Sequence, residues 1–231
     1  TAGGDILSYS NCWIYPVAHP TNGAVPLFTV SNLTVNRFGG FDANAMGFGG
    51  GLRSGATASN TAWGPGNNGH NAGASHGGMG TIGGYSGAPG EIYGDPDAPI
   101  LPGSGARCGY TTSTYTPYYG PWGGGSVQIR ALGTVALYGL MTASGTTGVT
   151  VAGGGSSGGS IYITCGTFLG DTNGVLQANG GLGAYGSQRG GGGGGGRIAV
   201  WRKNDLSGGL VSNYVAGGLG YSLDSAYTNC L

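Results

Sequence analysis

Short runs of alternating apolar and polar residues recur along the chain, and a glycine-rich stretch leads into several of them. Val127-Gln128-Ile129 returns as Ile161-Tyr162-Ile163 and again as Ile198-Ala199-Val200, at spacings of 34 and 37 residues. Alternation with a period of two is typical of half-buried strands. Self-similarity at about 20–50 residues is typical of repeated units that pack on one another. Because no stretch keeps a helical period, the sequence predicts an all-β protein.

The repeats predict a short parallel β-helix-like solenoid. Each unit offers two or three short strands whose apolar residues point inward at alternate positions. A long excursion at 45–125 is rich in Gly, Ser, Asn and Pro and interrupts the first unit. We therefore divide the chain into 1–24, an N-terminal capping or donor-strand segment, 25–205, the glycine-rich solenoid, and 206–231, a C-terminal cap.

Glycine supplies 57 of the 231 residues. Ordering so many glycines is entropically costly, so their backbone groups need compensating partners. The tracts at 148–159 and 180–196 leave their units at equivalent points, as the 45–125 excursion does. We expect them to lie side by side as a flanking layer of polyglycine-type extended helices. The alternative is that they are flexible linkers.

Charge is scarce. Charged residues make up 7% of the chain, the formal net charge is zero, and Lys203 and Glu91 are the only lysine and glutamate. Such a balance argues against nucleic-acid partners. It also removes much of the repulsion that keeps copies apart, which favours self-association. No segment has the roughly 18 consecutive apolar residues of a membrane span.

The four cysteines show no metal-binding spacing. An even count in a lysine-poor chain predicts disulfides and an oxidising compartment, and a chain that begins at Thr1 fits a secreted product. We favour an internal Cys108–Cys165 bridge. Because Cys12 and Cys230 lie at opposite ends of the predicted solenoid, they would pair more easily between successive copies.

Catalytic and metal-binding patterns are weak. The eight acidic residues are scattered, and no nucleophile-elbow, zinc-protease or phosphate-loop signature occurs. His70 and His76 would need Glu91, Asp95 or Asp97 to complete a metal site. Asp95-Pro96-Asp97 is read more simply as a turn with a local side-chain bond than as a calcium site. We predict that the protein is not an enzyme and carries no metal or cofactor.

The stretch 109–122 is the most suggestive surface segment. Its aromatic residues have three interpretations: a surface for copies of the same chain, a platform for sugar rings, or a shield over the glycine layer. Asn32-Leu33-Thr34 is a glycosylation sequon within a predicted strand. The candidate contact residues are Tyr110, Tyr115, Tyr118, Tyr119 and Trp122.

Several motifs together resemble those of large glycine-rich repeat proteins of the cell surface. They include Gly133-Thr134-Val135, Met141-Thr142-Ala143-Ser144-Gly145, and Gly190–Gly196 leading into Arg197-Ile198-Ala199-Val200. Gly73–Gly80 and Leu101–Gly105 are similar to further pieces of the same pattern. The resemblance covers about residues 30–200 and implies a secreted β-helix-like protein of the cell surface or matrix.

Together these observations predict a secreted structural protein that self-assembles into an extracellular filament or surface layer. Its expected partners are copies of itself. The alternative is an adhesin that binds glycans or a receptor through the 45–125 excursion. A carbohydrate-active β-helix enzyme is disfavoured because the clustered carboxylates that such chemistry needs are missing.

Overall fold

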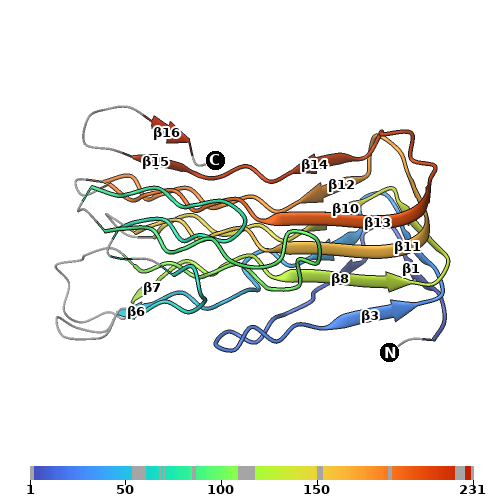
Figure 1. Ribbon diagram of the computed structural model, residues 1–231, viewed down its shortest axis with the longest axis horizontal. Coiled ribbons are helices and arrows are strands. Elements are labelled where there is room, and N and C mark those ends of the chain that lie inside the picture. Colours follow the sequence, from blue (N-terminus) through green and yellow to red (C-terminus); the bar gives the residue numbers. More distant parts are fainter. Residues whose placement is uncertain are drawn as a thin grey trace.

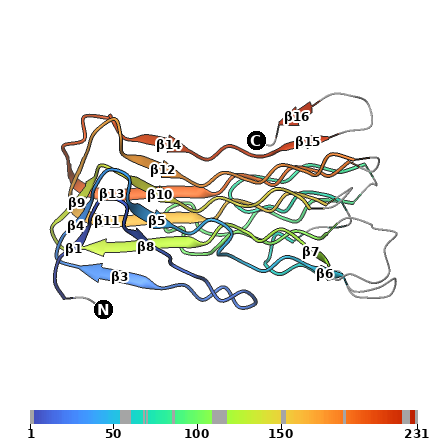
Figure 2. The same ribbon diagram turned by 180° about the vertical axis from the view of Figure 1, so that it is seen from behind.

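Strands are the only regular secondary structure in the described part of the chain (Figure 1). The computed structural model describes residues 3–53, 61–67, 69, 71–84, 87–108, 118–149, 153–186, 189–221 and 227–229. Most of the strands lie at one side of the molecule and the glycine tracts at the other, in both the front and the rear view (Figure 2). The fold therefore has two regions of different construction.

The first sheet has seven strands, all paired in parallel. Its path runs β1-β4-β9-β11-β8-β3, and β13 pairs with β11 off this path. The long strand β11 joins the two halves, because its first part pairs with β8 and its last part with β9. The strands are β1 (Ile6–Ser8), β3 (Leu27–Val30), β4 (Leu33–Val35), β8 (Ser126–Ala131), β9 (Thr134–Leu137), β11 (Ser160–Gly170) and β13 (Arg197–Asp205).

The second sheet has five parallel strands in the order β14-β12-β10-β5-β2. One line of paired residues crosses it from Ile14 through Phe41, Met141 and Leu176 to Asn213. The strands are β2 (Trp13–Ile14), β5 (Gly40–Asp42), β10 (Leu140–Thr142), β12 (Val175–Gln177) and β14 (Ser212–Tyr214).

Two short antiparallel pairs lie outside these sheets. β6 (Leu52–Arg53) pairs with β7 (Tyr118–Tyr119), and β15 (Leu219–Tyr221) pairs with β16 (Tyr227–Asn229). Both lie on the glycine side of the molecule in Figure 1. They are not part of the parallel sheets.

The apolar core lies between the two sheets, where every second residue of a strand points inward. Phe41 from the second sheet meets Phe28 from the first in an edge-to-face contact, with ring centroids 5.4 Å apart. The largest fully buried apolar side chains are Phe41, Leu33, Ile129, Leu137, Met141, Ile161, Ile163 and Leu176. We call the two sheets and this core the strand region.

The second region, called here the glycine region, comprises the described parts of 45–125, 143–159, 178–196 and 215–221. Its backbones are extended and bond laterally to several neighbours in turn. Ala74 donates to the carbonyl of Gly155, Gly155 donates to Gly191, and Gly191 donates to Asn71, at 3.0, 2.8 and 2.7 Å. Segments far apart in the sequence thereby satisfy one another's backbone groups.

Glycine is required where these backbones touch. A Cβ atom built on Gly73 would lie 1.7 Å from the carbonyl oxygen of Gly192, and one on Gly193 would lie 2.0 Å from that of Ser156. Such distances are far inside van der Waals contact, and the obstacle is backbone. The composition of the region therefore follows from its packing.

This architecture corrects the predicted β-helix-like solenoid with its layer of polyglycine-type helices. The described residues contain no helix, and the glycine tracts carry no regular secondary structure. The strands gather into two many-stranded parallel sheets, and β11 runs unbroken over 11 residues, although the prediction was of short strands only. Repeat spacing indicates which segments pair, but it does not say whether a turn separates consecutive strands.

The predicted terminal segments take part in the sheets. Residues 1–24 supply β1 and β2, which pair with β4 and β5. Residues 206–231 supply β14, which pairs with β12. Each terminal segment therefore provides an outermost strand of a sheet.

Candidate functional site

The two ends of the sheets are the candidate functional surfaces. At the C-terminal end, defined by β13 and β14, each of these strands has one pairing partner among the described strands, β11 and β12 respectively. At the N-terminal end, defined by β1, β2 and β3, the same holds for each strand. In Figure 1 the two ends lie at the top and the bottom, with β14 above and β3 below. Both ends present outer strand edges whose backbone groups are available for pairing.

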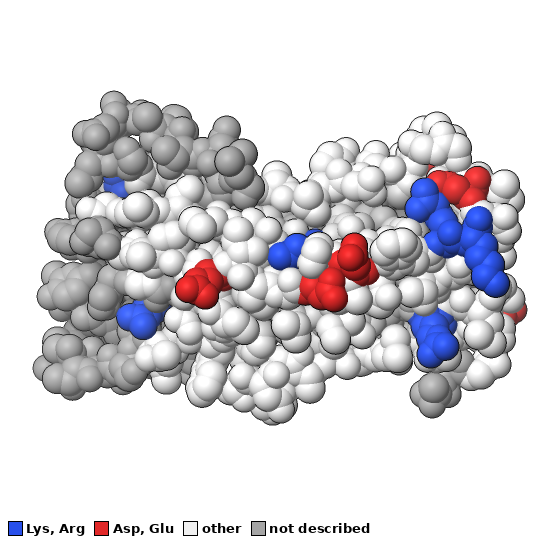
Figure 3. All heavy atoms as spheres, in the orientation of Figure 1, with Lys and Arg blue, Asp and Glu red and all other residues white. Residues whose placement is uncertain are grey.

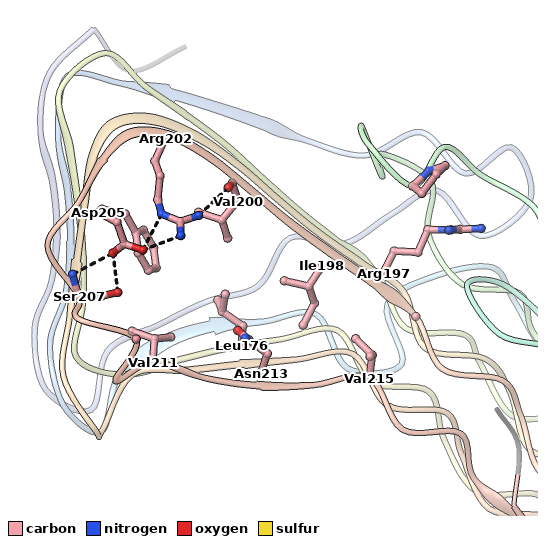
Figure 4. A pocket seen from close by; sticks show the side chains of 14 residues that line it. Leu176, Arg197, Ile198, Val200, Arg202, Asp205, Ser207, Val211, Asn213 and Val215 are labelled. Carbon is pink, nitrogen blue, oxygen red and sulfur yellow. Dashed lines mark hydrogen bonds and ion pairs between the residues drawn. The ribbon is translucent and has the colours of Figure 1, made fainter.

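The C-terminal end is hollowed. A cavity of about 540 Å³ opens between β13 and β14, over the last covered layer of core side chains (Figure 4). Its floor is formed by Phe168 and Leu176, which are buried. Its apolar walls are Ile198, Val200, Val211 and Val215, and its polar walls include Arg202, Asp205, Ser207 and Asn213.

The inward-facing residues of β13 are apolar in the first half of the strand and charged in the second half. Ile198 pairs in register with Ile161, and Val200 with Ile163, so the core continues to the end of the sheet. Two residues further, Arg202 takes the position that Cys165 holds in β11. Asp205 likewise pairs with the buried Phe168. Charged residues thus occupy inward positions at this end only in the second half of β13.

Arg202 and Asp205 are joined directly. The guanidinium Nε and Nη2 of Arg202 donate to Asp205 Oδ2 at 2.8 and 2.5 Å, while its Nη1 donates to the carbonyl of Val200 at 3.1 Å. Ser207 donates to Asp205 Oδ1 through its backbone N–H at 3.0 Å and its hydroxyl at 2.6 Å. In Figure 4 these side chains point into the space that the strands enclose.

This bonding holds the Asp205 carboxylate ionised. Hydrogen bonds from Ser207, followed by those from Arg202, lower the pKa of Asp205 to about 2. The pair therefore stays charged across ordinary pH, and the end of the core is half apolar and half ionic.

The N-terminal end is more apolar. Three of its apolar side chains are partly buried and pack against the core, namely Ile6, Ile14 and Phe28. Leu7, Trp13 and Leu27 are exposed on the outer faces of the same strands. Charged side chains are sparse over the face drawn in Figure 3, and one group of them gathers near the upper end of the strand region. The two ends differ in chemistry, because the ionic pair belongs to the C-terminal end.

A buried polar cluster lies where the two regions meet. His76 has no exposed surface, its Nδ1 lies 2.9 Å from the carbonyl oxygen of Gly158, and its ring centroid is 4.6 Å from that of Tyr93. His76 Nε2 has no hydrogen-bond partner among the described residues. Arg197 donates to the carbonyl of Tyr93 at 3.2 Å through Nη2.

Burial shifts the acid–base behaviour of this cluster. Desolvation, together with the nearby Arg197 charge, lowers the pKa of His76 to about 4, although its hydrogen bond to Gly158 opposes the shift. Desolvation also raises the pKa of Tyr93 far above its usual value. Both side chains are therefore neutral at ordinary pH, as their packed surroundings require.

The segment 93–102 leads from this cluster across the outer face of three strands. The carbonyl of Asp97 accepts from the indole N–H of Trp201 at 2.6 Å. Those of Ile100 and Leu101 accept from the side chains of Gln128 and Ser160, at 2.9 and 2.6 Å. These bonds tie the excursion to β13, β8 and β11, which gives the cluster a structural role.

The residues weighed above as possible metal ligands do not gather. His76 is enclosed in the glycine region, and His70 lies outside the described residues. Asp95 Oδ1 accepts from the backbone N–H of Asp97 at 2.8 Å, which is the local turn that the sequence favoured. Across the described residues, no group of three or more His, Cys, Asp and Glu is placed to hold a metal ion.

The predicted Cys108–Cys165 disulfide is wrong, whereas the pairing of Cys12 with Cys230 between copies stays a prediction. No disulfide joins Cys12, Cys108 or Cys165; Cys12 is exposed, whereas the other two are buried. Burial raises the pKa of the Cys165 thiol, because Cys165 points into the core. Cys230 lies outside the described residues. The spacing of cysteines could not reveal that Cys165 serves as a core residue.

The aromatic contact surface is described only in part. Tyr110 and Tyr115 lie outside the described residues, and Tyr118 belongs to β7. Tyr119 is 62% exposed, whereas Trp122 is half-buried and its carbonyl accepts from the hydroxyl of Ser156 at 2.6 Å. Among the described residues of this set, Tyr119 is therefore the one whose side chain is known to lie exposed on the surface.

Asn32 lies between β3 and β4, not inside a strand as expected. Its Oδ1 accepts from the backbone N–H of Thr134 at 2.8 Å, and its Nδ2 donates to Asp5 at 2.9 Å. The side-chain amide is thus engaged within the fold at the corner of the sheet.

Sequence reasoning missed the Arg202–Asp205 pair, although a signal was present. Aligning Ile198 with Ile161 by the repeat places Arg202 at the inward position of Cys165. A charge at an inward position marks either a protected end or a functional surface.

Comparison with known protein families, with curated proteins and with solved structures finds no match for this chain. Among the residues that the structure describes, no helix is long and apolar enough to cross a membrane. The two sheet ends therefore carry the functional inference on their own.

Proposed function

We propose that the protein is a secreted structural protein that self-assembles end to end into an extracellular filament or surface layer. The observation that carries the proposal is the pair of unlike, open sheet ends. The C-terminal end has a hollow of about 540 Å³ over the core, and the N-terminal end has the partly buried Ile6, Ile14 and Phe28. A hollow at one end and apolar side chains at the other suit contact between successive copies.

Strand direction supports the same arrangement. All pairings within the two large sheets are parallel, so the N-terminal end of one copy and the C-terminal end of another present strands that run the same way. A second copy displaced along the direction of strand pairing extends both sheets without turning over. Such an unlike-ended contact does not close on itself and generates an open array.

Composition adds to this support. The net charge is zero and charged residues are 7% of the chain, so long-range repulsion between copies is weak. The extracellular setting rests on the resemblance to glycine-rich repeat proteins of the cell surface.

The first experiment compares the purified chain with two matched variants by electron microscopy and by the fraction that pellets on ultracentrifugation. Val200→Lys places a charge in the hollow, whereas Val149→Lys places the same change on an exposed residue of the glycine region. We expect the parent chain and Val149→Lys to form filaments or sheets. The pelleting fraction of Val200→Lys should fall about tenfold, since a lone ammonium is costly to cover.

Circular dichroism must show that both variants remain folded. A parent chain that stays monomeric in sedimentation velocity at every accessible concentration would refute the proposal. Equal assembly by the two lysine variants would show that the C-terminal hollow is not the contact.

A second candidate is adhesion through the 45–125 excursion, which is favoured by its exposed apolar side chains. They are Leu52, Trp63, Met79, Ile82, Ile92, Ile100 and Tyr119. A glycan array that compares the parent with Trp63→Ala and Tyr119→Ala tests this candidate. Binding that both substitutions abolish, in a chain that does not assemble, would favour adhesion over self-assembly.

A further inference from the structure

We propose that β2 of an incoming copy pairs in parallel with the open edge of β14, with Trp13 opposite Ser212 and Ile14 opposite Asn213. This inference rests on the proposed self-assembly and specifies its contact. The partner is a second copy of this chain, displaced along the direction of strand pairing. The N-terminal and C-terminal ends thereby become the two sides of one joint.

The register of the second sheet carries this assignment. Its outward positions follow the line Trp13, Gly40, Leu140, Val175 and Ser212, and each residue pairs directly with the next. Neighbouring strands lie about 4.8 Å apart. One further step of the same displacement brings Trp13 of the incoming copy opposite Ser212. The sheet then continues across the joint without a break in direction or register.

The hollow accommodates the inward side chains of that added strand. Ile14 occupies the same line as the buried Phe41, Met141 and Leu176, and Leu176 forms part of the floor of the hollow. Ile14 of the incoming copy would therefore enter next to Val211 and Val215. Burying this isoleucine side chain removes apolar surface from water, which makes this contact an anchor of the joint.

The first sheet continues in the same step, through β1. Its register runs from Ile6 through Leu33, Val135 and Phe168 to Asp205. Ile6 of the incoming copy would come to lie over the ionic pair. The pair keeps its internal hydrogen bonds there, so it can be covered, although at a desolvation cost.

In the displacement that pairs β2 with β14, β3 of the incoming copy does not pair with β13. The line from Phe28 through Ile129 and Ile163 to Val200 has four members, whereas the lines that begin at Ile6 and Ile14 have five. When β2 sits on β14, β3 lies two strand spacings from β13, so the width of one strand separates them. The competing joint pairs β3 with β13 directly, which would place Leu27 opposite Ala199. The two joints make different predictions for cross-linking.

Cross-linking between copies tests the register. All variants carry Cys12→Ser and Cys230→Ser, and each new cysteine is introduced in a separate chain, so that mixing two chains allows only cross-links between copies. Trp13→Cys is mixed with Ser212→Cys, and Tyr15→Cys, one position past β2, with Tyr214→Cys. These two mixtures are in register. The off-register control mixes Trp13→Cys with Tyr214→Cys, and the competing joint is represented by Leu27→Cys mixed with Ala199→Cys.

After mild oxidation with copper phenanthroline, non-reducing electrophoresis measures the disulfide-linked dimer. The two in-register mixtures should yield at least about tenfold more dimer than either comparison mixture, because adjacent parallel strands place their Cα atoms within disulfide range. Reduced samples are checked by electron microscopy for assembly equal to the parent. Two in-register mixtures guard against one substitution disturbing the strand.

The outcomes separate the two proposals. Filaments that cross-link best through Leu27→Cys and Ala199→Cys, or through the off-register mixture, would overturn the β2–β14 joint while leaving self-assembly in place. Filaments with no cross-link in any mixture would also overturn it. Folded protein that forms no filaments and no dimer would refute the proposed function itself.

Discussion

The strand region and the glycine region are ordered by opposite means. In the strand region, buried side chains such as Phe41 and Leu33 fill the space between two sheets, and area removed from water stabilises the fold. In the glycine region the backbones themselves are in contact, and lateral hydrogen bonds satisfy them. The strand region should therefore be destabilised by substitutions that remove side-chain volume, and the glycine region by substitutions that add it. Substitutions of these two kinds test whether the regions are built differently.

The largest effect is expected in the strand region. Phe41→Ala removes a fully buried ring that contacts Phe28, and the cavity that remains should lower the free energy of unfolding by about 3–5 kcal/mol. Chemical denaturation followed by circular dichroism measures the change. Phe38, which is exposed, supplies the control: Phe38→Ala should shift the midpoint little. Equal effects of the two substitutions would contradict the assignment of the core.

The reverse change should damage the glycine region almost as much. Gly73→Ala adds one methyl group, and its Cβ would lie 1.7 Å from the Gly192 carbonyl oxygen. Separating these backbones should lower the free energy of unfolding by about 3 kcal/mol. Gly4→Ala is the matched control, because nothing lies within 4 Å of a Cβ at that position. If Gly73→Ala unfolds like the parent, the contact between the glycine backbones is wrong.

The junction of the two regions should make stability depend on pH. The pKa of His76 is about 4 in the folded protein, below its ordinary value of 6.5. The unfolded chain therefore binds the extra proton first, and stability falls as the pH drops from about 6.5 to 4. The loss approaches roughly 3 kcal/mol at pH 4.

Thermal unfolding at several pH values measures this slope. His76→Gln should flatten it, whereas His19→Gln, at an exposed position, should leave it unchanged. Asp205, whose folded pKa is lowered to about 2, loses its contribution only as the pH falls from about 4 through 2, so the two groups act in separate pH ranges. A parent slope that persists in His76→Gln would remove this histidine as its source.

The smallest effect concerns the C-terminal end, and it is measured in assembly. The side chains of Arg202 and Asp205 are 37% and 34% exposed, so their ion pair adds little to the stability of one copy. Covering this ion pair in the proposed joint would cost desolvation free energy. The double variant Arg202→Met, Asp205→Leu should therefore lower the concentration at which half of the protein pellets, by about threefold to tenfold.

The single variant Asp205→Leu should act in the opposite direction, because it leaves the Arg202 charge without its carboxylate. The matched control is Lys203→Met, a neighbouring exposed position on the same strand. If both the double and the single variant assemble less well than the parent, the pair contributes attraction to the joint instead of a cost.

The sequence was informative wherever side chains alternate. The spacing of the repeats aligned Val127 with Ile161 and Ile161 with Ile198, and these residues pair in register. The inward apolar residues follow from the period of two, because a strand between two sheets buries every second side chain. The same alignment could have placed Arg202 in the hollow.

The arrangement of the glycine tracts could not be predicted in the same way. Glycine has no side chain, so a tract such as 190–196 contains no pattern that tells which neighbours its N–H groups will choose. His76 was weighed only as a possible metal ligand, yet the fold buries it between Tyr93 and Gly158. The repeat pattern predicted short strands, and it did not show that β11 continues from Ser160 to Gly170 without a break. Each of these features depends on contacts between segments far apart in the chain.

The unequal reach of the strands at the N-terminal end has a mechanical consequence. β1 and β2 project one strand spacing beyond β3, so this end is a step, with a high side and a low side. In the proposed assembly, a copy rotated about the fibre axis would not fit onto this step. The step would therefore fix the rotation of each added copy, and it would give the fibre two distinguishable ends and resistance to twisting.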